Sequence, residues 1–263
     1  MIRVLVSGAA GRMGSEVVKA VTAADGMEVV SAVDPGAVGS RVPDGQGEGI
    51  SCEPDLAIAI AETSPDVVVD FTHPSVVEGN IRTTLAAGVD CVVGTTGLSE
   101  ESLAALASTA PDGTCLFVAP NFAVGAVLMM EFAAKAARFM PHVEIIELHH
   151  DKKADAPSGT ALRTARLIAA ARSSVPEVPG RETELPGMEG ARGAVVEDIH
   201  VHSVRLPGLV AHQEVLFGGQ GQTLSLRHDS IDRTSFMPGV VLAVSKVGAL
   251  SGLVVGLEKL MGE

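Results

Sequence analysis

The sequence predicts an α/β protein that has an N-terminal parallel-sheet domain and a second, α+β domain with an open mixed sheet. In the first half, short valine-rich runs alternate with helical segments, which is typical of a parallel sheet covered on both faces. After Pro120-Asn121 the alternation stops, and later strand patterns flank the glycines of 218–221, which indicates an antiparallel hairpin. Hydrophobic residues make up 46% of the 263-residue chain, so it can form a folded core.

The elements of the first half follow from its apolar runs and turn residues. We expect helices at Met13–Ala24, near 78–87 and near 100–110, with Ser99 as the N-cap of the last. The glycine- and proline-rich residues 34–53 show little periodicity and predict a connection. The expected strands are Ile2–Ser7, Glu28–Val33, Val67–Phe71, Cys91–Gly94 and Leu116–Ala119.

The second half mixes long helical patterns with strands. Residues 173–192 contain many Pro, Gly and charged residues and predict an exposed loop, and Thr234–Leu260 is helical or mixed apolar in character. The expected helices are Gly125–Phe139 and a helix opened by Pro157-Ser158-Gly159 that runs to about Arg172. The expected strands are Val143–His149, 195–204, 210–217 and Gln222–His228.

Composition excludes several classes of function. The net charge of −13 argues against a nucleic-acid or anionic-membrane partner, and the absence of tyrosine removes any mechanism that needs a phenolic acid. Cys52, Cys91 and Cys115 lack metal-ligand spacing, and the last two are interpreted as buried hydrophobic residues. Without a leader or an apolar stretch of membrane-spanning length, the chain is expected to be cytoplasmic.

A glycine-rich loop joins the first strand to the first helix. Glycines at 8, 11 and 14 allow a tight turn and close approach of a pyrophosphate to the helix N-terminus. Asp34 ends the next strand and can accept hydrogen bonds from an adenosine ribose. We therefore predict a Rossmann-like dinucleotide site whose loop residues are Gly8, Ala9, Ala10, Gly11, Arg12 and Met13.

Two later strand ends are further candidates for cofactor binding. Ligands of open parallel sheets bind beyond the carboxyl ends of the strands. Loops there could hold the nicotinamide ribose and carboxamide, although each taken alone is more often a simple turn. The residues concerned are Gly94, Thr95, Thr96 and Gly97, and Ala119, Pro120, Asn121 and Phe122.

The segment from Glu147 to Thr160 contains the densest set of reactive side chains. His149, at a strand end, suits a general acid, and Lys153 can pair with an anionic substrate or stabilise developing negative charge. Ser158, Gly159 and Thr160 open a helix whose free N–H groups can bind a carboxylate. His149 and His150 can share one site only if the strand ends between them.

No metal site is predicted. The nearby lysines would repel a cation from His149 and His150, which could otherwise be only an exposed strand end. His200 and His202 share a strand face, but no third ligand is evident, so a solvated face is expected. His212 and His228 are interpreted in the same way.

The quoted motifs together resemble those of the dihydrodipicolinate reductase family, over essentially the whole chain and in the same order. The stretch from His149 to Thr160 is the most specific part, and Asp151-Lys152 lies where the family varies, so no role is carried to it. The motif series is residues 8–14, Asp70-Phe71-Thr72-His73-Pro74, residues 93–97, residues 119–122 and residues 149–160.

The resemblance implies a reaction and roles. NAD(P)H would deliver hydride to a cyclic imine dicarboxylate of the lysine and diaminopimelate pathway, after loss of water from the hydroxylated form. His149 would be the general acid and Lys153 a second proton donor or charge stabiliser. His150, Gly159 and Thr160 would hold the substrate carboxylates. The loops at 8–13, 94–96 and 119–122, with Asp34, would contact the dinucleotide.

The resemblance also implies domain organisation and assembly. Residues 1–122 and 232–263 would form the dinucleotide-binding domain, and residues 123–231 the substrate-binding and oligomerisation domain. Family members are usually tetramers joined through the sheet of the second domain, so a homotetramer is expected. Two alternatives stay open: another amino-acid-pathway NAD(P) dehydrogenase, and a non-catalytic regulator that senses a dinucleotide.

Cofactor choice depends on two residues. Asp34 should bond the ribose hydroxyls of NADH and repel a 2′-phosphate, whereas Arg12 could bind that phosphate or could equally be a solvated arginine. We therefore expect NADH to be preferred and NADPH to be used as well.

Overall fold

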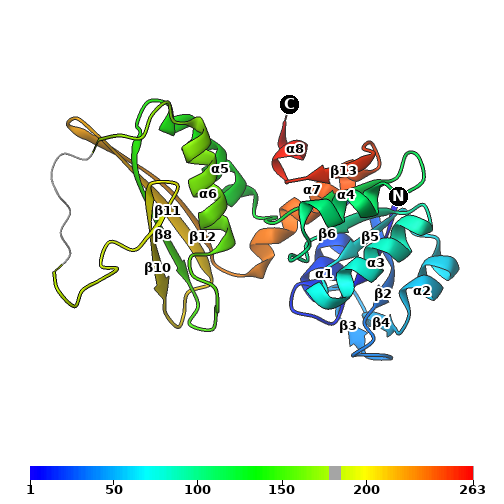
Figure 1. The fold of residues 1–263 in the computed structure, drawn as a ribbon. Helices are drawn as coiled ribbons and strands as arrows, with labels where there is room; N and C mark the ends of the chain where they lie inside the picture. The colour runs from blue at the N-terminus through cyan, green and yellow to red at the C-terminus, as the bar shows by residue number, and fades with distance from the viewer. Residues whose placement is uncertain (178–184, 263) are drawn as a thin grey trace. The chain divides into compact units, whose positions relative to one another are not determined.

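The chain folds into two compact units, described for residues 1–177 and 185–262 of a computed structural model. Unit 1 is Met1–Val124 together with Arg233–Glu263, and unit 2 is Gly125–Asp232. Figure 1 shows the C-terminal segment, drawn in orange and red, within the α/β layers of unit 1. Within the described residues, no helix is both long and apolar enough to cross a membrane.

Unit 1 is built on an eight-stranded sheet in the order β13-β7-β6-β5-β1-β2-β4-β3. Neighbouring strands are parallel, except for the antiparallel pair of β3 and β4. This confirms the predicted parallel-sheet domain. The strands are β1 (Ile2–Ser7), β2 (Met27–Val33), β3 (Arg41–Val42), β4 (Ile50–Glu53), β5 (Val67–Asp70), β6 (Asp90–Val93), β7 (Cys115–Val118) and β13 (Gly252–Val255).

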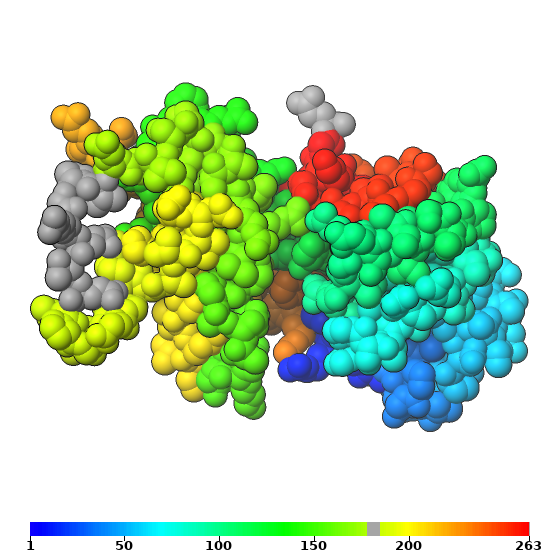
Figure 2. Space-filling view, in the orientation of Figure 1, coloured from blue at the N-terminus to red at the C-terminus, as the bar shows by residue number. Residues whose placement is uncertain are grey.

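Helices cover the sheet, and every residue of β5 and β7 is buried. Side chains of α3 and α4 pack with those of β6 and β7 in one apolar cluster that includes Ile81, Leu103 and Leu116. In Figure 2, the cyan and green atoms of this part of the chain close over the face turned to the viewer. The helices are α1 (Gly14–Ala23), α2 (Leu56–Thr63), α3 (Pro74–Ala86), α4 (Glu100–Ala107), α7 (Met237–Val247), α8 (Glu258–Met261) and a 3₁₀ turn at Arg233–Phe236.

Three of the first four helices begin at a side-chain cap. Asp55 accepts from the Ile58 amide, His73 from the Ser75 amide, and Ser99 from the Ser102 amide, the last as predicted. At α1 the N-cap position is Met13, whose side chain makes no cap hydrogen bond. Because the first N–H groups of a helix lack partners within it, α1 differs from the other three in having no side chain that caps them.

Unit 2 contains the predicted open mixed sheet, which has five strands in the order β12-β11-β8-β10-β9. β8 and β10 are parallel, and the remaining pairs are antiparallel, including the predicted hairpin of β11 and β12. The long helices α5 and α6 lie on the same side of this sheet (Figure 1). The elements are α5 (Val124–Ala137), β8 (His142–His149), α6 (Gly159–Ala171), β9 (Ala194–Val196), β10 (Ile199–Arg205), β11 (Ala211–Gly219) and β12 (Gln222–Ser230).

On the helix-covered face of this sheet, the side chains change from apolar to polar toward the end of β8. Residues paired across neighbouring strands point to the same face. The row through the centre of β8 is apolar, and the next two rows contain most of the reactive groups. The rows are Val201, Ile145, Val215 and Leu226; then Ser203, Glu147, Gln213 and His228; then Arg205, His149, Ala211 and Ser230.

Four segments differ from the sequence predictions. Residues 34–53 are not only a connection, since they include β3 and β4, and α2 was not predicted. The strand expected at 195–204 is two strands, because the chain reverses at Glu197 and Asp198, which both have positive φ. The C-terminal stretch inserts β13 between α7 and α8. Of the loop expected at 173–192, residues 178–184 lie outside the described residues, and the rest contains no helix or strand.

Candidate active site

The glycine loop between β1 and α1 is held by close backbone contacts. Gly8 has a φ of +78°, and a Cβ there would lie 2.4 Å from the Phe71 carbonyl oxygen. A Cβ on Gly14 would lie 2.1 Å from the Gly8 carbonyl oxygen. Both positions therefore require glycine, which fixes the loop against the start of α1.

Asp34 lies directly beside this loop. Its carboxylate accepts hydrogen bonds from the Ala10 amide at 3.1 Å and from the Gly36 amide at 3.0 Å. The structure thus places Asp34, the residue predicted to bind the adenosine ribose, next to the glycine loop, which is predicted to bind the pyrophosphate. Arg12 is exposed at the tip of the same loop.

Asp70 is a buried carboxylate at the end of β5 that joins two loops. It accepts from the Thr72 amide and hydroxyl, from the Thr95 hydroxyl at 2.9 Å and from the Asn80 side-chain amide at 2.8 Å. Thr95 also accepts from the Thr72 amide at 2.8 Å. The loop after β5 is therefore tied to the loop after β6. The sequence motif contained Asp70, but no role was predicted for it; the available signal was an acidic residue at the end of an apolar strand.

The two predicted strand-end loops of unit 1 meet around Phe71. A Cβ on Gly94 would lie 2.1 Å from the Phe71 ring, and the Phe71 and Phe122 ring centroids are 5.6 Å apart. Asn121 accepts from the Ala123 amide at 2.9 Å. The loops after β5, β6 and β7 therefore pack together at the carboxyl edge of the sheet, with Thr96 exposed and Thr95 turned inward to Asp70.

In unit 2, His149 and Glu147 form a close pair at the end of β8. β8 ends at His149, so His150 already lies outside the strand, as the shared site requires. The Nδ1 atom of His149 lies 2.5 Å from Oε2 of Glu147, and the histidine side chain is 14% exposed. The imidazole is thus held in place and still reaches the surface.

Glu147 itself is fully buried and has several donors. Arg205 donates to both carboxylate oxygens, at 2.9 and 2.8 Å, and the Ser158 amide donates at 3.2 Å. Burial opposes ionisation of Glu147, but hydrogen bonds from His149, Arg205 and Ser203 outweigh it and lower its pKa to about 2. Glu147 is therefore a carboxylate at neutral pH.

Lys153 belongs to the same network. Its Nζ donates to Asp155 at 2.7 Å, an interaction that lowers the pKa of Asp155. The backbone oxygen of Asp155 accepts from Arg205 at 2.6 Å, so the loop that contains Lys153 is anchored to the Glu147–Arg205 pair. The backbone of Lys153 also donates to the His150 carbonyl oxygen at 3.2 Å.

The α6 N-terminus completes this cluster. Ser158 is the N-cap, its hydroxyl accepts from the Ala161 amide, and a Cβ on Gly159 would meet no atom within 4 Å. Of the predicted residues, His149, Lys153 and Ser158 are therefore connected through Glu147 and Arg205. No role is predicted from the sequence for Glu147 or Arg205. An acid two residues before a strand-end histidine was a usable signal for Glu147, whereas Arg205 comes from a distant strand.

Three histidines of the second sheet, His200, His202 and His212, are paired rather than solvated, which corrects the prediction of a solvated face for these three. His202 contacts Glu144 at 2.8 Å, and His200 contacts the Arg192 carbonyl oxygen at 2.8 Å. His212 contacts Asp229 at 2.7 Å. His228 is half-buried, and burial lowers its pKa. Among the described residues, no cluster of His, Cys, Asp or Glu could hold a metal ion.

The two strand cysteines are buried, as predicted. Burial raises the pKa of Cys115 to about 12 and that of Cys91 well above its ordinary value. Both are thiols at neutral pH and therefore poor nucleophiles.

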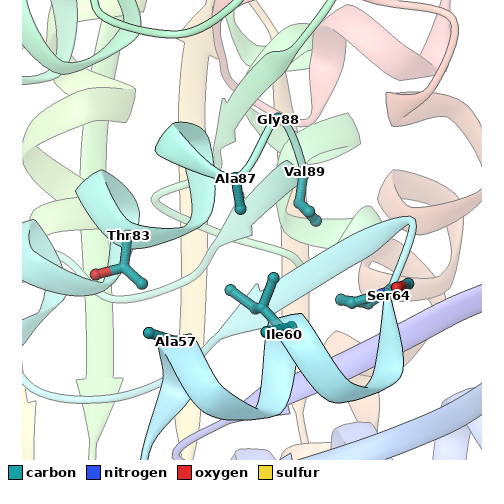
Figure 3. A pocket seen from close by; sticks show the side chains of 9 residues that line it. Ala57, Ile60, Ser64, Thr83, Ala87, Gly88 and Val89 are labelled. Carbon is teal, nitrogen blue, oxygen red and sulfur yellow. The ribbon is translucent and has the colours of Figure 1, made fainter.

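A hollow of about 470 Å³ between α2 and α3 is not a candidate for catalysis (Figure 3). Ser64 and Pro65 precede β5, and Gly88 and Val89 precede β6, so the hollow lies at the amino ends of these strands. Ligands of parallel sheets bind at the opposite edge. Its lining contains no titratable side chain.

Comparison with known proteins agrees with this arrangement. Two family models match the chain, "Dihydrodipicolinate reductase, N-terminus" over residues 2–122 and "Dihydrodipicolinate reductase, C-terminus" over residues 125–261. A 4-hydroxy-tetrahydrodipicolinate reductase of Mycobacterium sp. (strain KMS) is 52% identical over 262 residues, which cover 99% of each chain. One from Syntrophomonas wolfei is 49% identical over 263 residues, which cover 98% of each chain.

Solved structures give the same result. The dipicolinate-bound dihydrodipicolinate reductase from Paenisporosarcina sp. TG-14 matches with a TM-score of 0.84 and 44% identity, covering 98% of this chain and 99% of that one. An amine dehydrogenase from Mycobacterium smegmatis, with a TM-score of 0.65 and 18% identity, shares the fold alone. With family models over both units and close relatives over the full length, the chain belongs to the dihydrodipicolinate reductase family.

Proposed function

We propose that the chain catalyses the reaction named by its relatives, the pyridine-nucleotide-dependent reduction of the cyclic imine formed from 4-hydroxy-tetrahydrodipicolinate. The product is tetrahydrodipicolinate, in the diaminopimelate route to lysine. The observation that carries the proposal is the unit 2 cluster, in which a surface-reaching imidazole, a lysine and a helix N-terminus are joined by one buried carboxylate. A dinucleotide-sensing regulator would not need such a cluster.

Unit 1 is proposed to bind the dinucleotide. The uncapped start of α1 favours a pyrophosphate, because its first N–H groups and the positive end of the helix dipole face the same point. Asp34 suits the ribose hydroxyls of the adenosine. A bound nicotinamide would supply the hydride. The proposed cofactor residues are Gly8, Ala9, Ala10, Gly11, Arg12, Met13, Asp34, Gly94, Thr95, Thr96, Ala119, Pro120, Asn121 and Phe122.

Unit 2 is proposed to bind the dicarboxylate and to manage its proton. His149 donates the one proton that the ring takes up as hydride arrives, and Lys153 stabilises negative charge or is the alternative donor of that proton. His150, Ser158, Gly159 and Thr160 are proposed to hold the two carboxylates. This local set of cations and N–H groups attracts an anion that the net charge of −13 would otherwise repel.

Cofactor preference, assembly and location are proposed from the same features. NADH is preferred and NADPH is used, because Asp34 disfavours a 2′-phosphate and the exposed Arg12 can partly offset this. A homotetramer through the unit 2 sheet is supported by the partly buried Ile146 and Leu148 on its face away from the helices. The location is proposed to be the cytoplasm, which is consistent with a biosynthetic reductase.

The direct test is oxidation of NADH in the presence of the hydroxylated substrate, generated in the cuvette by the enzyme that makes it. The absorbance of the reduced nicotinamide should fall only when both the substrate and the chain are present. Dipicolinate should inhibit this reaction competitively. Binding of NADH without any oxidation would favour the regulator instead. Oxidation with a different amino-acid-pathway substrate but not this one would favour another dehydrogenase.

A further inference from the structure

Glu147 contacts His149, the predicted general acid, but is itself closed to solvent. Its side chain is fully buried, whereas those of Asp155 and His149 are 58% and 14% exposed. No substrate could contact Glu147 in this conformation. Any effect it has on the reaction must therefore act through a neighbouring residue.

We propose that Glu147, itself locked by Arg205, is a positioning residue that sets both the tautomer and the direction of the His149 ring. The proposal rests on the proposed role of His149 as the general acid. It adds that Glu147 and Arg205 together leave one nitrogen of that ring available for proton transfer.

The tautomer follows from the chemistry of the contact. An ionised carboxylate can only accept hydrogen bonds, so the ring nitrogen that faces it must carry a proton. Nδ1 faces Glu147 at 2.5 Å, so Nδ1 keeps its proton in the neutral and in the protonated ring. Proton exchange is then confined to Nε2, at the other side of the imidazole.

Direction follows from how Glu147 is held. Arg205 binds both oxygens in a bidentate geometry, and the Ser158 amide binds Oε1, so the carboxylate cannot rotate away from the ring. Paired strands add a second constraint, because Glu147 and His149 are two residues apart on one face of β8, and Arg205 is opposite His149 on β10.

Arg205 also connects Glu147, and through it His149, to the loop that contains Lys153. One of its nitrogens donates both to Glu147 and to the Asp155 carbonyl oxygen, and Asp155 in turn accepts from Lys153. The groups that face Glu147 are Arg205, His149, the Ser203 hydroxyl and the Ser158 amide. Removing the carboxylate would release the ring while leaving the surface groups of the site in place.

The test is a double-mutant cycle between Glu147→Gln and His149→Gln, with turnover and NADH binding measured for each protein. Glu147→Gln alone should lower kcat by about 10- to 100-fold and leave the NADH dissociation constant within about twofold. In the His149→Gln background the same change should lower kcat by less than about threefold, because its target is gone. Counting NADH sites per chain separates loss of folded protein from loss of turnover.

A matched control exists on the same strand. Glu144 also contacts a histidine, His202, but on the opposite face of the sheet. Glu144→Gln, checked for unchanged assembly size, should leave kcat within about twofold of the parent. If Glu147→Gln does not fold, Glu147→Asp takes its place in the cycle, since it retains the charge for Arg205 but withdraws the carboxylate from Nδ1.

The outcomes separate the two proposals. Normal kcat in Glu147→Gln, or equal fold-losses with and without His149, would overturn the positioning role while leaving the acid role intact. Near-normal turnover in His149→Gln alone would overturn the acid role itself. Loss in both single variants with little further loss in the double variant supports both.

Discussion

Each unit has a buried carboxylate near the carboxyl end of a strand, and the two differ in what surrounds them. Asp70 of unit 1 is held by neutral donors, namely two hydroxyls, a side-chain amide and a backbone amide. Glu147 of unit 2 is held by a guanidinium and an imidazole as well as by a backbone amide. The first arrangement fixes loops without adding cations, and the second links a buried anion to an imidazole, which can exchange a proton.

This difference fits the separate tasks proposed for the units. Orienting a dinucleotide requires rigid loops, which neutral hydrogen bonds to a carboxylate provide. Transferring a proton requires a titratable group whose geometry is fixed, which an ion pair beside the imidazole provides. Four predictions test whether the two regions are as distinct as this comparison suggests.

The largest expected effect is at His149. His149→Gln should lower turnover by about two to four orders of magnitude, the range typical of a positioned general acid. NADH binding, measured by calorimetry, should be unchanged because the residues proposed to bind the dinucleotide are in unit 1. Turnover near that of the parent would mean that unit 2 does not supply the acid through this residue.

A smaller loss is expected at Lys153. Lys153→Ala removes a cation near the α6 N-terminus, so substrate KM and the dipicolinate inhibition constant should each rise by about tenfold or more. Pyridine monocarboxylate provides the comparison, and it should bind the parent more weakly than dipicolinate does. Equal inhibition by the two compounds would argue against a site for two carboxylates.

The ion pair of unit 2 also predicts an acid-sensitive stability. Glu147 has a pKa of about 2 in the folded chain against an ordinary value of 4.5, because its hydrogen bonds outweigh the effect of burial. Its contribution, on the order of 3 kcal/mol, is therefore complete above about pH 4.5 and is lost as the pH falls toward 2.

Thermal unfolding of the parent and of Glu147→Gln measures this contribution. The difference in Tm between them should be constant from pH 7 to about pH 5 and should shrink below pH 4.5. A difference that stays constant down to pH 3 would show that folding does not lower the pKa of Glu147.

The smallest effect concerns cofactor choice in unit 1. Arg12→Ala should reduce kcat/KM for NADPH more than for NADH, and Asp34→Ala should do the reverse, each by roughly 3- to 30-fold. Both side chains lie at the phosphate loop, where Asp34 already bonds to the Ala10 amide. A strict preference for NADPH in the parent would mean that Asp34 does not read the ribose.

Local sequence patterns predict most of the fold and identify the segments that contain the candidate site residues. The phosphate loop, the strand-end loops and the stretch from His149 to Thr160 are each continuous in sequence, so their chemistry is visible there. α2 is not predicted because Leu56–Thr63 begins with six consecutive apolar residues, whose large side chains alternate with alanine rather than form a helical stripe. β3 has only two residues, and β4 lacks the continuous apolar run of β5 and β7. The apolar residues of β13 merge with the helical or mixed apolar stretch expected at Thr234–Leu260.

The support of the site was harder to predict because it comes from distant residues. Arg205 meets Glu147 across 58 residues of sequence, through the parallel pairing of β8 with β10. Thr95 meets Asp70 across 25 residues, through the pairing of β5 with β6. The order of strands in a sheet decides such contacts, and sequence pattern alone does not specify that order.

The most direct test of the comparison measures NADH affinity and kcat together in Asp70→Asn and Glu147→Gln. Asp70→Asn loosens the loops after β5 and β6, so the NADH dissociation constant should rise about tenfold while kcat at saturation changes by less than about threefold. Glu147→Gln should show the opposite pattern, with kcat reduced and NADH affinity retained. If both variants lose the same quantity to the same extent, the two buried carboxylates do not divide cofactor binding from proton transfer, and the account is wrong.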